Sequence, residues 1–264
     1  MDFTRNNIIE LHKRIVQFGN ENFAQIEKLN LDPNDELDST YVGMILRQMT
    51  INNDLASLML NKNHGYHTSE FILLRCLIDD FLHISYIVNQ PNSEEVIVNF
   101  NADALDKNYK KIYDLAILNE ETLGGNYPFY PTYALMAQVK EKMKNSPKRQ
   151  QHFSDKENFK FKTFKNTGQI IRELKDEKYS HSLRRAYFIW RKLSDFVHYS
   201  NTAFEEEQMI DPEKDSTYTE FAEIISYSYF TILNCFKHFQ NRYNLKIIDT
   251  NNLSQYYKNT EHPN

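Results

Sequence analysis

Glycine and proline are scarce in this sequence, with six and seven residues of 264, respectively. Turn-rich β architectures place these residues at their many tight turns, so the composition disfavours a β-sandwich or barrel. Leucine, isoleucine, lysine, glutamate and asparagine are abundant instead, and 17 tyrosines and 18 phenylalanines supply large side chains. The composition therefore predicts an all-α fold with a sizeable core.

Cysteine is rarer still. Cys76 and Cys235 both stand in apolar helical patterns, and no CxxC or Cys/His ligand spacing accompanies them. This usage indicates reduced core thiols in a cytoplasmic protein and disfavours a disulfide or a zinc site. A glycine-rich phosphate loop, an HExxH motif and a serine-hydrolase elbow are also missing from the sequence, so we predict no cofactor and no metal ion.

Long uncharged apolar runs are missing too. The longest apolar stretch contains Arg75, Asp79, Asp80 and His83, and such charges are costly in a bilayer. The first residues lack the apolar segment of a secretory signal. We therefore expect a soluble cytoplasmic protein with no membrane partner. Its formal net charge of −5 provides no global attraction for nucleic acid, although local basic patches remain possible.

Apolar residues at helical spacing, together with capping residues, predict eight helical segments. These segments span residues 3–29, 39–60, 68–88, 92–118, 132–144, 169–175, 182–200 and 217–243. Two glycines and two prolines in LGGNYPFYPTY predict a loop, and an irregular excursion is expected near residues 119–168. The predicted architecture is a single bundle of six to eight helices over residues 1–250, with a flexible tail over residues 251–264.

The predicted helix over residues 68–88 is apolar nearly all round, which is typical of a central helix. Arg75, Asp79 and His83 interrupt this pattern at positions i, i+4 and i+8, so they share one face of the helix. Because buried charges are tolerated only when they are paired, we expect Arg75 to pair with Asp79.

A second polar stripe lies on the predicted helix over residues 182–200. Arg191, Asp195 and His198 fall at i, i+4 and i+7 on one side of this helix, and Ser194 borders them. One interpretation is structural, with a helix ion pair between Arg191 and Asp195 and a satisfied core histidine.

In the other interpretation the two stripes meet. Arginine would bind a phosphate or carboxylate, aspartate would orient histidine, and histidine would move a proton. Such a set suits RNA cleavage by 2′-hydroxyl attack, and it equally suits the binding of a small anion without chemistry.

The pattern of Arg191 and His198, with six residues between them in a helix of an all-α bundle, resembles the HEPN superfamily of prokaryotic toxins and defence ribonucleases. This resemblance implies metal-independent RNA cleavage. It also implies that Arg191 and His198 of two protomers form a composite site, which requires a homodimer.

A second resemblance rests on an R-x3-[DE] motif at Arg75 to Asp79 and an LS-x-x-VH motif at Leu193 to His198. Together these motifs are similar to a family of uncharacterised bacterial helical proteins, a domain of unknown function, over about residues 40–240. The resemblance implies a shared fold and a site at Arg75, Asp79, Ser194 and His198. It implies no particular activity.

Residues 140–166 form the distinctly basic region of the sequence, with Phe153, Phe159, Phe161 and Phe164 interleaved among lysines. Lysines follow a phosphate backbone and aromatic rings stack on unpaired bases, so this region fits a contact with single-stranded RNA. The alternative is a solvated surface segment that its phenylalanines anchor.

These observations predict an RNA-directed, HEPN-like protein of a bacterial defence or toxin system, and a metal-independent endoribonuclease if it is an enzyme. Its catalytic residues would be Arg191 and His198. The supporting residues would be Arg75, Asp79, His83, Ser194 and Asp195. The alternative is a non-enzymatic helical module that binds a cognate protein or a small anionic ligand in a polar cavity. A purely structural role for both stripes also remains open.

Overall fold

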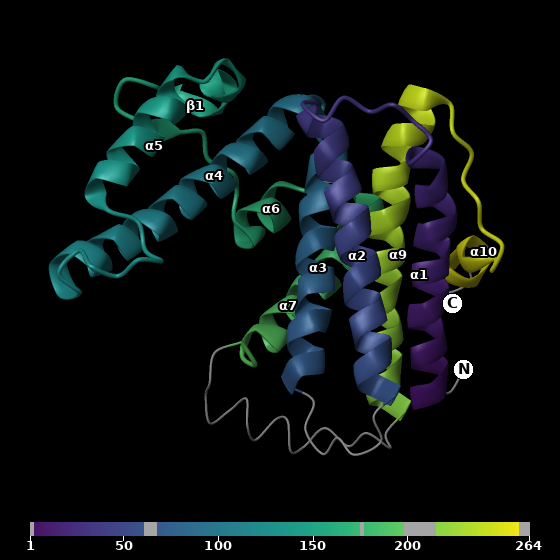
Figure 1. Ribbon diagram of the computed structural model, residues 1–264. Helices are drawn as coiled ribbons and strands as arrows, with labels where there is room; N and C mark the ends of the chain where they lie inside the picture. The colour runs from purple at the N-terminus through teal and green to yellow at the C-terminus, as the bar shows by residue number, and fades with distance from the viewer. Residues whose placement is uncertain (1–2, 61–67, 175–176, 198–214, 259–264) are drawn as a thin grey trace. The chain divides into compact units, whose positions relative to one another are not determined.

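The computed structural model describes residues 3–60, 68–174, 177–197 and 215–258, which are predominantly helical (Figure 1). The prediction of an all-α protein is confirmed. The chain forms two compact units. We call residues 1–89 with 167–264 the helical bundle, and residues 90–166 the inserted unit. None of the helices in the described ranges is long and apolar enough to span a membrane.

Four long helices run side by side in the helical bundle (Figure 1): α1 (Arg5–Ile26), α2 (Glu36–Leu60), α3 (Thr68–Val88) and α9 (Asp215–Tyr243). The α2 helix is antiparallel to the other three. The contacts that establish these directions are Arg5–Met59 and His12–Asn52 between α1 and α2, Asp38–His238 and Asn52–Ser228 between α2 and α9, and Phe71–Phe221 and Phe81–Tyr227 between α3 and α9.

The core of the helical bundle consists of apolar side chains that recur at helical spacing on these helices. Fully buried examples are Ile8, Ile15, Phe18, Ile45, Leu55, Leu74, Leu77, Ile78, Phe236 and Phe239. The α1 helix approaches α2 closely at Gly19, where a Cβ atom would lie 2.5 Å from Cγ of Met49. A side chain at this position would therefore force the two helices or Met49 to move.

Two further helices, α6 (Thr167–Glu173) and α7 (Glu177–Ser194), pack against α3. The α7 helix ends before the predicted boundary at residue 200. Its last turn tightens, because the amides of Asp195, Phe196 and Val197 bond to carbonyls three residues earlier rather than four. Asp195 therefore lies in a turn after the helix, and His198 lies outside the described residues.

After α9 the chain returns along α1. Asn22 exchanges two hydrogen bonds with the backbone of Ile248, at 2.8 and 2.9 Å, and Arg14 donates to the carbonyl of Asn251. The short helix α10 (Leu253–Lys258) follows, with Leu253 and Tyr257 buried. The segment for which the sequence predicted a flexible tail thus begins with a packed helix.

The inserted unit contains α4 (Ser93–Ile117), a π-helical turn η1 (Leu118–Thr122), α5 (Tyr133–Asn145) and a 3-10 turn η2 (Pro147–His152). Strands β1 (Phe153–Asp155) and β2 (Lys160–Phe161) complete it as an antiparallel hairpin that pairs Phe153 with Phe161. The predicted excursion near residues 119–168 therefore has ordered local structure.

Candidate functional site

The two predicted polar stripes meet, because α3 and α7 pack in antiparallel register. At one end the rings of Phe71 and Phe196 lie 4.5 Å apart between centroids. One turn along α3, Nε of Arg75 donates to Oγ of Ser194 at 2.9 Å. One further turn along, Oδ1 of Asp79 accepts a hydrogen bond from the α7 helix. Three of the predicted site residues are therefore brought together.

The donor to Asp79 is the indole N–H of Trp190, at 3.0 Å. Ser194 in turn donates to the backbone carbonyl of Trp190 at 2.7 Å. We call Arg75, Asp79, Trp190 and Ser194 the Arg75 cluster; all four residues are half-buried. The cluster joins α3 to α7 through directional polar contacts in addition to apolar packing.

The prediction that Arg75 forms an ion pair with Asp79 is wrong. The ion pairs among the described residues do not include it, because the carboxylate of Asp79 faces Trp190. The guanidinium of Arg75 lies over the Trp190 ring instead, 4.7 Å from its centroid. Its Nε atom is bonded to Ser194, whereas its two Nη groups have no hydrogen-bond partner in the part of the chain that the structure describes.

The sequence analysis did not identify Trp190 as a member of this site. Trp190 is the single tryptophan of the sequence, and it precedes Ser194 by one helical turn. A half-buried indole needs an acceptor for its N–H group, and its ring face attracts a guanidinium. The signal was therefore present in the sequence, as a tryptophan in register with a predicted Arg/Asp stripe.

The remaining predicted site residues lie around or beyond this cluster. Arg191 and Asp195 are exposed, and the described residues offer neither of them an ion-pair partner, so the helix ion pair expected between them is wrong. His83 lies one turn past Asp79 on α3 and is half-buried. His198 lies outside the described residues, so its predicted role stays a prediction.

The comparisons with known proteins give one family. The sequence pattern of a family of unknown function, DUF5677, matches residues 39–217. The chain belongs to this family. No curated protein and no solved structure matches it. The predicted membership of an uncharacterised helical family is thus confirmed. The matched residues include α3 and the described part of α7, so the whole Arg75 cluster lies in the portion of the chain that defines this DUF5677 protein.

A second polar network lies in the core of this DUF5677 protein. The buried carboxylate of Asp80 accepts hydrogen bonds from Arg47 and Gln48, each at 2.8 Å. Burial raises the pKa of Asp80, an effect that the neighbouring Arg47 opposes. Farther along α2, Nδ1 of His12 bonds to Oδ1 of Asn52 at 2.8 Å. These contacts link α1, α2 and α3 through directional hydrogen bonds.

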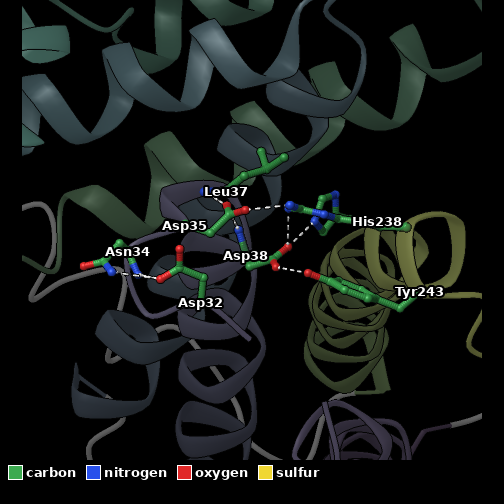
Figure 2. A network of polar contacts seen from close by, with 8 residues as sticks. Asp32, Asn34, Asp35, Leu37, Asp38, His238 and Tyr243 are labelled. Atoms are coloured by element: carbon green, nitrogen blue, oxygen red, sulfur yellow. Dashed lines mark hydrogen bonds and ion pairs between the residues drawn. The ribbon is translucent and has the colours of Figure 1, made fainter. Parts of the chain in front are cut away.

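A third network joins the start of α2 to the end of α9 (Figure 2). The buried carboxylate of Asp38 accepts hydrogen bonds from His238 at 2.6 Å, from Arg242 at 3.0 Å and from the hydroxyl of Tyr243. Arg242 also pairs with Asp35, at 2.7 Å. The hydrogen bond that the Tyr243 hydroxyl donates to Asp38 raises the pKa of Tyr243.

The Asp38 network differs from the Arg75 cluster in two respects. Three donors already surround the Asp38 carboxylate, whereas Arg75 has two unused donor groups. Asp38 and His238 also lie outside the residues that match the DUF5677 family. The Asp38 network is therefore best explained as a structural contact that holds α2 against α9. The Arg75 cluster is the better candidate for a functional site.

Proposed function

We propose that this DUF5677 protein binds a phosphate-bearing ligand at the Arg75 cluster. The observation that carries the proposal is a half-buried guanidinium without a carboxylate partner. A partly desolvated cation is stabilised by an opposite charge, and here the nearest acid on the same helix face is committed to Trp190. The cation–π contact compensates for only part of this cost.

The geometry of Arg75 suits an oxyanion with several oxygens. Ser194 and Trp190 hold the guanidinium in one orientation, so little side-chain freedom is lost when a ligand binds. The free Nη groups present parallel N–H bonds, which match two oxygens of a phosphate. Arg191 follows Trp190 directly and is also without an ion pair among the described residues, which favours a multiply charged phosphate over a single carboxylate.

A free phosphate, a nucleotide and an RNA backbone share this chemistry. The HEPN-like ribonuclease of a defence or toxin system is the enzymatic form of the same proposal. In that form Arg191 stabilises the charge that develops on phosphate, and His198 moves the proton of the 2′-hydroxyl. Phosphate binding at Arg75 is common to the enzymatic and the non-enzymatic form, so it is the step to test first.

The single tryptophan provides a direct probe. Inorganic phosphate, a nucleoside monophosphate and a short single-stranded RNA are titrated while Trp190 emission is followed, with calorimetry as a second readout. We expect a saturable change in emission and a rise in melting temperature. Arg75→Gln should weaken phosphate binding about 10- to 100-fold, the usual range for loss of a hydrogen-bonded charged group.

Arg185, which lies on α7 together with Trp190 and Ser194, is the matched control. It pairs with Glu223 at 3.2 Å, so Arg185→Gln removes the same charge from α7 and leaves the Arg75 cluster intact. Binding that is weakened equally by both variants contradicts the proposal, as does a wild-type protein that responds to none of the three ligands. If Arg75→Gln fails to fold, Arg75→Lys keeps the charge but removes the two-pronged donor. Unchanged phosphate affinity in that variant would also refute it.

A further inference from the structure

The basic region of the sequence belongs to the inserted unit, whereas the Arg75 cluster belongs to the helical bundle. Nine Lys and Arg residues stand between residues 140 and 165, against three Asp and Glu residues, in a chain whose net charge is negative. They are distributed over the end of α5, η2 and the β1–β2 hairpin. These elements are in contact, because Gln150 donates to the carbonyl of Lys144 at 2.7 Å and Lys144 reaches the side chain of Glu157 at 3.8 Å.

The phenylalanines of this region pack against one another and against α4. The rings of Phe153 and Phe161 lie 4.6 Å apart and both side chains are buried. Phe159 contacts Tyr109 with a centroid distance of 4.8 Å, and Phe164 contacts Phe100 at 5.1 Å. These rings form a small core under the hairpin, which is a different use from stacking on the bases of a nucleic acid.

The acidic residues neutralise little of the positive charge. The carboxylate of Asp155 accepts two hydrogen bonds from Asn158 in the hairpin turn, and Glu157 pairs with Lys144. Six cations form no ion pair within the described residues; one of them, Lys140, lies over the ring of Phe159, and the other five make no such ring contact. These five are Lys142, Arg149, Lys156, Lys160 and Lys162. We call these five residues the basic surface.

We propose that the basic surface binds the phosphodiester backbone of a nucleic acid. Clustered lysines and arginines attract a polyanion through its phosphates without reading the bases. A protein partner fits less well, because protein interfaces are centred on buried aromatic or aliphatic anchors. Residues 136–166 expose no large hydrophobic side chain, and each of these residues is described by the structure.

The test compares two double variants of the inserted unit in the full chain. Lys142→Gln with Lys160→Gln removes two exposed cations of the basic surface. Lys107→Gln with Lys110→Gln removes the same charge from α4, where each lysine pairs with an aspartate at 2.6 Å. Binding of a labelled single-stranded RNA, a single-stranded DNA of the same length and polyglutamate is measured by fluorescence anisotropy at several salt concentrations.

We expect the basic-surface variant to bind RNA or DNA roughly 25-fold more weakly at about 0.1 M salt, if each lysine contacts one phosphate. The slope of log affinity against log salt should fall by about 1.4, since each phosphate contact contributes about 0.7 for single strands. The α4 variant should match the wild type. The RNA and DNA arms identify the nucleic acid that is preferred.

An equal loss of affinity in both double variants would show that only net charge matters and would overturn the proposal. Preferential binding of polyglutamate, or no binding of either nucleic acid by the wild type, would overturn it as well. Arg149→Gln provides an independent variant if the lysine pair disturbs the fold. The proposal stands apart from the Arg75 cluster, because the Trp190 titration with inorganic phosphate should be the same in all of these variants.

Discussion

His12 predicts a specific loss of stability in mild acid. Its side chain is fully buried in the helical bundle, with Nδ1 bonded to Asn52 and no hydrogen-bond partner for Nε2 among the described residues. Burial lowers the pKa of His12 from 6.5 to about 4. As the pH falls, the unfolded chain therefore binds a proton at His12 before the folded chain does. The contribution of His12 to stability is complete above pH 6.5 and is lost as the pH approaches 4.

The size of the effect follows from the two pKa values. The difference between 6.5 and about 4 corresponds to about 3 kcal/mol of unfolding free energy. For a protein of this size, this amounts to a fall of about 10 °C in melting temperature. Carboxylates also titrate in this range, so the prediction concerns the difference between two proteins and not the acid sensitivity of the wild type alone.

His12→Asn is the matched variant, because its amide can still donate to Asn52 but does not titrate. Urea unfolding is followed by Trp190 emission, which reports on the helical bundle, at pH 7 and pH 4. The wild type should lose about 3 kcal/mol more than His12→Asn between these pH values. Parallel losses would refute the assigned pKa, and so would an NMR titration in which the His12 ring is protonated near pH 6.5.

Three further predictions concern other positions. Gly19→Ala should destabilise the bundle by about 1–2 kcal/mol in urea unfolding, because the new methyl group collides with Met49, and an increase in stability would show that Met49 moves aside freely. Asp38→Asn should cost about 2–4 kcal/mol, since three donors lose a charged acceptor, and it should leave the response of Trp190 to phosphate unchanged. If the ribonuclease form is correct, RNA cleavage should persist in EDTA and disappear in both Arg191→Ala and His198→Ala. Cleavage that survives in either variant contradicts the assigned catalytic pair.

The helical spacing of apolar residues was sufficient to predict the fold class and most of the helices. It also placed Arg75 and Asp79 on one face of α3, and one of its two interpretations had this face meet the stripe that Ser194 borders. The spacing failed where the identity of a residue's neighbour mattered. Asp79 and Asp80 are adjacent in the sequence, yet one faces Trp190 on α7 and the other faces Arg47 on α2.

The end of α7 shows a second limit. The residues near Asp195 have a helical pattern, but local propensity does not determine where a helix yields to a turn. The tighter hydrogen bonds after Ser194 place Asp195 in a turn after the helix, and within the described residues it forms no ion pair with Arg191. The return of the chain along α1 is likewise a long-range feature, since it depends on hydrogen bonds such as those between Asn22 and Ile248.

That return path has a consequence for the order of folding. The α1 helix is synthesised long before residues 248–251, with which the side chains of Arg14 and Asn22 form hydrogen bonds across more than 220 positions. Contacts of such large sequence separation form slowly, because a long loop must close first. The flank of α1 that carries Arg14 and Asn22 therefore stays uncovered on the ribosome until residues 248–251 have emerged, and a nascent chain that stalls earlier would expose it to chaperones and proteases.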